Sequence, residues 1–79
     1  MTHPMSAADV AQRITEARKG LGLSLRTLAA KAGLSEASLR RKLGRRPDLL
    51  TLDDMLRLSD ALELPLPDLI QIDMSAVAA

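Results

Sequence analysis

The chain of 79 residues contains no cysteine, no aromatic residue and a single histidine. Without cysteine it can form neither a disulfide scaffold nor a thiolate metal site, and it has no thiol nucleophile. One histidine near the N-terminus, with hydroxyls that mostly occupy helix-cap positions, leaves no nucleophile–base pair for covalent catalysis. We therefore expect no enzyme activity, no catalytic residues, no metal site, no cofactor and no small-molecule ligand.

Long apolar runs are also missing. No stretch approaches the 18 or so residues that a membrane-spanning helix needs. The first residues, MTHPMSAAD, lack the charged start and apolar middle of a signal peptide. These absences predict a soluble, cytoplasmic protein that does not contact membranes.

The residues that are present favour one small helical domain. Hydrophobic residues make up 47% of the chain and none is aromatic, so the core must consist of Leu, Ile, Val, Ala and Met. A chain of this length forms one small core, and aliphatic side chains suit a compact helical bundle. We expect an all-α domain over residues 6–72, preceded by a short arm (1–5) and followed by a tail (73–79).

Charge is divided unequally along the chain. Residues 10–46 carry ten Lys or Arg against two Glu, a net charge of +8. Residues 47–79 carry one Arg against seven Asp or Glu, a net charge of −6. This asymmetry predicts a polyanionic partner for the first half.

The stretch Ser24–Arg46 predicts two short helices joined by a tight turn. Its first part places apolar residues at the i, i+3, i+4 and i+7 positions of one helical face: Leu25, Leu28, Ala29 and Ala32. Ser24 stands at an N-cap position, and Gly33 permits the left-handed backbone conformation of a sharp turn. Leu34 then faces the core and Ser35 caps the second helix. The pattern is that of a helix-turn-helix.

Caps and breakers predict five helices, near residues 6–20, 24–32, 35–44, 51–62 and 67–71. Ser6 with Asp9, and Thr51 with Asp54, have the spacing of capping boxes. The predicted inner stripe of the first helix is Val10, Ile14, Ala17 and Leu21. That of the fourth is Leu52, Met55, Leu56, Ser59 and Leu62, widened by Leu58. We expect burial of Leu28, Leu39, Leu43 and Leu56.

The second helix of the pair has two distinct faces at about 100° per residue. Leu39 and Leu43 point inward, and Arg41 stands opposite them. Beside and flanking Arg41 are small residues and cations: Ala37, Ser38, Arg40 and Lys42. Small outward residues allow close approach to another surface, and an Arg fork can hydrogen-bond guanine or grip phosphate.

These residues resemble the Cro-like phage repressor class of helix-turn-helix DNA-binding domains. The matching features are the Leu28-Ala29 pair, Gly33 four residues after Ala29, the Leu34-Ser35 turn and Leu39. The resemblance extends from about Val10 to Ile70. In this class the position of Leu25 often holds a Gln that contacts a phosphate. Leu25 departs from this pattern, so we expect Arg26 or a backbone N–H to make the contact instead.

The resemblance implies DNA-contacting roles for named residues. The family's base-reading positions correspond to Glu36, Ala37 and Arg41. The residues that we expect at the DNA backbone are Arg26, Thr27, Ser38, Arg40, Lys42, Arg45 and Arg46. The leading hypothesis is a sequence-specific regulator of double-stranded DNA, a small phage-type or bacterial repressor acting by operator occupancy. The alternative is an antitoxin-like or protein-interaction module that uses the same frame to hold a protein.

The C-terminal segment allows two interpretations. Ile70, Ile72 and Met74 alternate with polar residues as in a half-buried strand, but the run is too short to distinguish strand from helix. An apolar tail on a small domain suggests a subunit contact; otherwise Leu69 and Ile70 only close the core and the end frays. Because helix-turn-helix proteins commonly pair on half-sites, we expect a homodimer on a palindromic operator through Leu66–Met74.

Overall fold

The computed structural model describes residues 5–69, and this range contains five α-helices, one short 3₁₀-helix and no strand. The elements are α1 (Ala7–Gly20), α2 (Leu25–Ala32), α3 (Glu36–Leu43), η1 (Pro47–Leu49), α4 (Leu52–Ala61) and α5 (Leu66–Leu69). The predicted all-α, five-helix architecture is confirmed, with boundaries displaced by one or two residues; the predicted end of the fifth helix lies outside the described residues. None of the helices found in residues 5–69 has the length and hydropathy needed to cross a membrane.

Hydroxyl caps begin the four longer helices. In each case a Ser or Thr side chain accepts a hydrogen bond from the backbone N–H three residues later, at Ser6, Ser24, Ser35 and Thr51. At the first and last of these sites an Asp side chain also accepts a hydrogen bond from the backbone N–H of the cap residue, so both predicted capping boxes are present. Each cap stabilises its helix by about 1 kcal/mol, which places the helix starts where the sequence predicted them.

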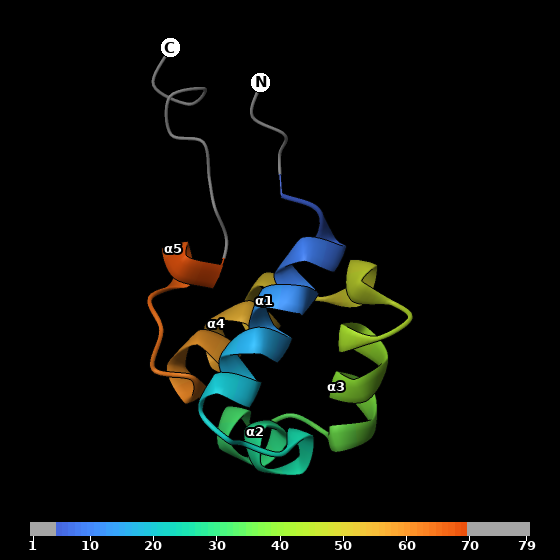
Figure 1. The fold of residues 1–79 in the computed structure, drawn as a ribbon. Helices are drawn as coiled ribbons and strands as arrows, with labels where there is room; N and C mark the ends of the chain where they lie inside the picture. Colours follow the sequence, from blue (N-terminus) through green and yellow to red (C-terminus); the bar gives the residue numbers. More distant parts are fainter. Residues whose placement is uncertain (1–4, 70–79) are drawn as a thin grey trace.

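The core is aliphatic and draws on every α-helix. Its largest fully buried side chains are Ile14, Leu28, Leu39, Leu58, Leu62 and Leu69. Helix α1 crosses the middle of the molecule, with α3 on one side, α4 and α5 on the other, and α2 at one end (Figure 1). Burial of Leu28 and Leu39 is confirmed. Leu69, the last residue of α5, closes the core.

Helix α4 buries only part of its predicted inner stripe. Leu56, expected to be buried, is 48% exposed, and Leu52 is 59% exposed, whereas Leu58 and Leu62 are buried. This helix has more leucines than one face can bury, so apolar spacing alone does not define its orientation. Ser59 can also lie inside, because its hydroxyl donates to the carbonyl of Leu56 at 2.9 Å.

Two further burial predictions need correction. Leu43 is only half-buried, because it is the last residue of α3 and packs at the edge of the core. Leu21 was expected on the inner stripe of α1 but is 54% exposed. The helix ends at Gly20, so Leu21 is only its C-cap residue, and the chain turns directly after it at Gly22, which has a φ of 69°.

Candidate nucleic-acid interface

The turn between α2 and α3 has the predicted glycine-dependent geometry. Gly33 lies in the left-handed region with φ 69° and ψ 31°. The Gly33 N–H donates to the Ala30 carbonyl at 3.2 Å, and the Leu34 N–H donates to the Ala29 carbonyl at 2.9 Å. These two bonds form a Schellman motif. The backbone conformation therefore favours glycine here. A Cβ at this position would lie 3.1 Å from Nη1 at the end of the Arg57 side chain on α4, which would have to shift slightly.

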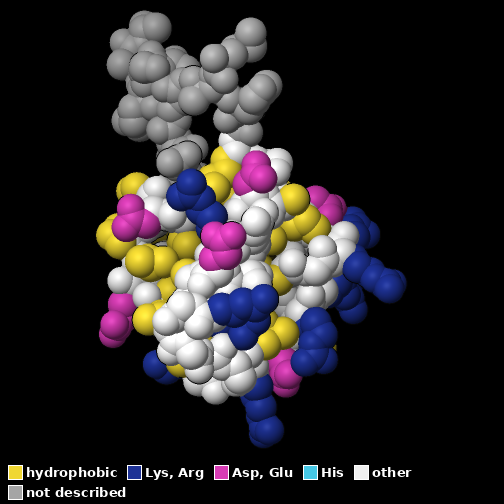
Figure 2. Space-filling model, viewed as in Figure 1, with side chains coloured by type: hydrophobic (Ala, Val, Ile, Leu, Met, Phe, Trp, Pro, Cys, Tyr) yellow, Lys and Arg dark blue, Asp and Glu magenta, His cyan; other side chains and the backbone are white. Residues whose placement is uncertain are grey.

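Helix α3 is oriented as its periodicity predicted. Leu39 is 1% exposed and packs into the core, where α3 meets α1 and α2. Ala37 and Arg41, on the opposite side, are exposed. Lys and Arg side chains gather over α3 on the right of the view in Figure 2. The helix therefore presents a small residue and cations to solvent along one edge of the molecule.

Three cations predicted to contact DNA have no bound carboxylate. Arg26, Arg41 and Arg45 are exposed, and within residues 5–69 none of their side chains makes a hydrogen bond or ion pair. An exposed guanidinium without an acidic partner can bind a phosphate or a base edge without first breaking an ion pair. These three side chains are available to an external anion.

Two other predicted DNA contacts are already paired at the surface. Arg40 Nη2 donates to Glu36 Oε1 at 2.8 Å within α3. Arg46 donates to both carboxylate oxygens of Asp48, from Nε at 3.1 Å and from Nη2 at 2.9 Å. The hydrogen bonds from Arg46 hold the pKa of the Asp48 carboxyl below its ordinary value. Exposed pairs of this kind are weak, typically about 0–1 kcal/mol, so a phosphate can compete with them.

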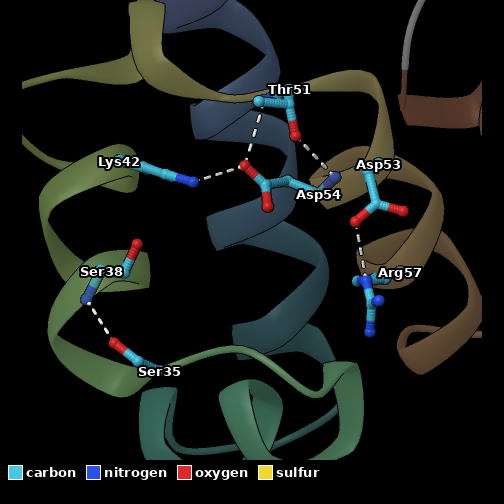
Figure 3. Close-up of polar contacts among 7 residues, drawn as sticks. All are labelled: Ser35, Ser38, Lys42, Thr51, Asp53, Asp54 and Arg57. Carbon is cyan, nitrogen blue, oxygen red and sulfur yellow. Dashed lines mark hydrogen bonds and ion pairs between the residues drawn. The ribbon is translucent and has the colours of Figure 1, made fainter.

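Lys42 makes a more protected contact. Its Nζ donates to Asp54 Oδ2 at 2.7 Å, across the gap between α3 and the start of α4 (Figure 3). Asp54 is buried, and burial alone would raise the pKa of its carboxyl. Hydrogen bonds from Lys42 and Thr51 outweigh this effect, and the pKa is lowered. The carboxylate is therefore ionised near neutral pH and pairs with the ammonium.

The remaining predicted contacts have polar roles within the fold. The Thr27 hydroxyl accepts a bond from the Ser24 hydroxyl at 2.9 Å and is exposed. Ser38 is half-buried, and its backbone N–H donates to the Ser35 hydroxyl at 3.0 Å. Glu36 is half-buried beside Arg40 at the start of α3. All ten predicted residues except Arg26 and Thr27, which belong to α2, lie on α3 or in the loop that follows it.

Sequence reasoning missed the two acidic partners, Asp48 and Asp54. Asp54 was identified only as part of a capping box, which is a local signal. Its contact with Lys42 joins residues 12 positions apart and depends on how α3 and α4 pack. The Arg46–Asp48 pair spans only two residues and lies at the start of the 3₁₀ turn Pro47–Leu49, between the third and fourth predicted helices.

Comparison with known proteins agrees with this geometry. The family of Cro/C1-type helix-turn-helix DNA-binding domains matches residues 2–74 of the chain. Among solved structures, the restriction-modification controller protein C.AhdI from Aeromonas hydrophila is 30% identical with a TM-score of 0.72. That match covers 81% of this chain and 96% of the controller protein.

A second solved structure, the hypothetical transcription factor NHTF from Neisseria, supports the fold alone because it is only 17% identical. Its TM-score is 0.73, and the match covers 99% of this chain and 93% of that one. No curated protein matches the chain. The family match spans the helix-turn-helix and every other described element, and it agrees with the prediction that the protein is not an enzyme. The chain belongs to the Cro/C1-type helix-turn-helix DNA-binding domains and is a DNA-binding transcriptional regulator.

Proposed function

We propose that the protein binds a specific operator in the bacterial cytoplasm and represses transcription by occupying that site. The observation that carries this proposal is the outer face of α3, where Ala37 and the unpaired Arg41 are exposed opposite the buried Leu39. The major groove admits an α-helix, and an Arg fork there can hydrogen-bond guanine O6 and N7. The occupied operator would be closed to polymerase.

The proposed contacts divide into base reading and backbone positioning. Ala37 and Arg41 face base edges, and Glu36 accepts a hydrogen bond from a cytosine amine. To do so, Glu36 exchanges its pairing with Arg40 for the base, which releases Arg40 to a phosphate. The other proposed backbone contacts are Arg26, Thr27, Ser38, Arg45 and Arg46. Lys42 is considered separately below.

Similarity to a restriction-modification controller protein favours one biological setting. The 30% identity to that protein covers most of both chains. We therefore favour a controller of restriction-modification genes over a phage repressor. Both act through the same operator-binding chemistry.

A homodimer on a palindromic operator is the proposed assembly. Leu52 and Leu56 are exposed on α4. Leu56 also borders a shallow groove that continues to α5, lined by Ser59, Asp60, Glu63, Leu64, Pro65 and Leu66. Apolar side chains are visible on this side of the molecule in Figure 2. An exposed apolar surface beside α5 supports pairing through the segment Leu66–Met74, of which residues 70–74 lie outside the described part of the chain.

Site selection from random duplex DNA tests the proposed function. The protein should enrich a palindromic sequence, with half-sites roughly 34 Å apart if a dimer binds. Affinity for a scrambled duplex should fall steeply as salt rises, because binding releases counterions from the phosphates. Failure to enrich any sequence would contradict the proposal. Salt-independent capture of a protein partner would instead support the antitoxin-like or protein-interaction alternative.

The proposed dimer is tested by shortening the chain after Leu69. An earlier end would remove Leu69 itself, which is 1% exposed in the core, and would unfold the domain. The shortened chain, compared with the full chain in sedimentation and operator-binding measurements, should bind the palindrome less tightly. Unchanged affinity and unchanged mass would show that residues 70–79 make no subunit contact.

A further inference from the structure

The carboxylate of Asp54 joins two helices at once. Its Oδ2 accepts hydrogen bonds from the ammonium of Lys42 at 2.7 Å and from the backbone N–H of Thr51 at 3.1 Å (Figure 3). The Asp54 N–H in turn donates to Thr51 Oγ1 at 3.0 Å. The capping box at the start of α4 therefore also binds the last turn of α3. Within residues 5–69, this is the only side-chain hydrogen bond between these two helices.

Residues 44–51 connect the two helices and carry two of the cations proposed to bind DNA. Backbone bonds hold the start of this loop, since the Gly44 N–H donates to the Arg40 carbonyl at 3.0 Å and the Arg46 N–H donates to the Arg41 carbonyl at 2.9 Å. The Lys42–Asp54 pair closes the base of the loop. Fixing both ends of a loop restricts the conformations of the residues between them.

Lys42 is also poorly placed to leave this contact. Its side chain is 21% exposed and that of Asp54 is 7% exposed, compared with 69% for Arg40 and 55% for Arg46. If Lys42 moved to a phosphate, a buried carboxylate would lose its cation, which is costly. Unpaired Arg41 and Arg45 can bind an anion without that loss.

We propose that Lys42 is a positioning residue, which together with Asp54 holds α3 and the basic loop 44–51 in register against α4, and that it does not bind a DNA phosphate. This inference rests on the proposed DNA interface. The pair acts on specificity because base reading requires Arg41 to be held at a defined position, whereas non-specific attraction to phosphate tolerates movement.

The variants Lys42→Met and Asp54→Asn distinguish a positioning role of Lys42 from a phosphate contact. Methionine keeps an apolar stem without the charge, and asparagine keeps an oxygen that can accept the Thr51 N–H. If Lys42 positions the helix, each change lowers the ratio of selected-site to scrambled-duplex affinity by roughly tenfold, the effect of one charge-assisted hydrogen bond. The double variant should lose no more than either single one, and the salt slope should not change.

A phosphate contact predicts a different pattern. Lys42→Met would then weaken binding to both duplexes equally and lower the salt slope by about one. Asp54→Asn would release Lys42 and strengthen binding to both. Either result would overturn the proposal. If the wild-type chain bound the selected site and the scrambled duplex equally well, the proposed function itself would be wrong. That failure is therefore distinguishable from a failure of the proposal about Lys42.

Asp53→Asn is the matched control. Asp53 adjoins Asp54 in sequence and pairs with Arg57 at 2.9 Å, but the pair is exposed and lies within α4 (Figure 3). This change should leave the affinity ratio unaltered, and thermal unfolding should show that all variants are folded at the assay temperature.

A measurement on the wild-type chain needs no variant. The NMR signal of the Lys42 ammonium should show that its hydrogen bond to Asp54 persists when operator duplex is added. Transfer of that signal to a phosphate environment would overturn the proposal.

Discussion

Helices α3 and α4 are built alike but present different surfaces. Each begins after a hydroxyl cap and buries leucine in the same core, Leu39 in α3 and Leu58 in α4. Opposite its buried face α3 exposes cations, whereas α4 exposes Leu52 and Leu56. The buried faces hold both helices in one core. The outward face of α3 suits a polyanion, whereas that of α4 suits an apolar neighbour.

Replacing leucines on the two sides of α4 should give the largest contrast in stability. Leu58→Ala removes a side chain that is 0% exposed and should lower the free energy of unfolding by about 2–5 kcal/mol. Leu56→Ala, on the exposed side, should change it by no more than about 0.5 kcal/mol. Urea unfolding of both variants measures the difference.

The measurement should be repeated at several protein concentrations, because dimerisation through Leu56 would add a concentration-dependent contribution. Equal losses for the two variants at low concentration would show that Leu56 is buried, as the sequence predicted.

Replacing Arg41 tests the outward face of α3. Arg41→Ala should cost roughly 1–3 kcal/mol of affinity at one base position and relax the preference there. The free energy of unfolding should stay unchanged, because Arg41 is exposed and without a partner among the described residues. Titration against the selected site and its single-base variants measures the effect. Equal loss on selected and scrambled duplexes would assign Arg41 to the backbone and move base reading toward Glu36 and Ala37.

The contrast between α3 and α4 also shows which features a sequence can predict. Caps and the left-handed Gly33 depend on residues within a few positions, so their signals are local. The orientation of α3 follows from its apolar residues, Leu39 and Leu43, which allow one inward face. Helix α4 has several leucines on different sides, and packing against the other helices selects between the possible inward faces.

In the candidate site, too, some features follow from the sequence and others depend on how the helices pack. The exposure of Arg41 and Ala37 follows from the period of α3, and the structure agrees with it. The engagement of Lys42 with Asp54 depends on the approach of two helices and leaves no periodic signal. The DNA contacts of these residues remain predictions.

Acid should weaken the connection between α3 and α4. The pKa of Asp54 is lowered in the folded chain, so its ion pair contributes stability above the ordinary Asp pKa. That contribution is lost as pH falls through the lower, folded-state value, in the window below about pH 4. Asp54→Asn should therefore flatten the decline in the free energy of unfolding below that pH. An unchanged pH dependence in chemical denaturation would show that Asp54 does not contribute; Asp53→Asn again serves as the control.

The smallest effects are expected in the loop after α3, where Arg46 is paired and Arg45 is not. Arg46→Ala should weaken binding to all duplexes about equally and lower the salt slope by at most about one. Its effect should be smaller than that of Arg45→Ala, because Arg46 must first give up two hydrogen bonds to Asp48. Asp48→Asn should strengthen binding uniformly, since it releases Arg46 and removes a negative charge near DNA. Affinities over a salt series would contradict this order if Arg46→Ala changed the preferred sequence, because a residue that only grips the backbone carries no base preference.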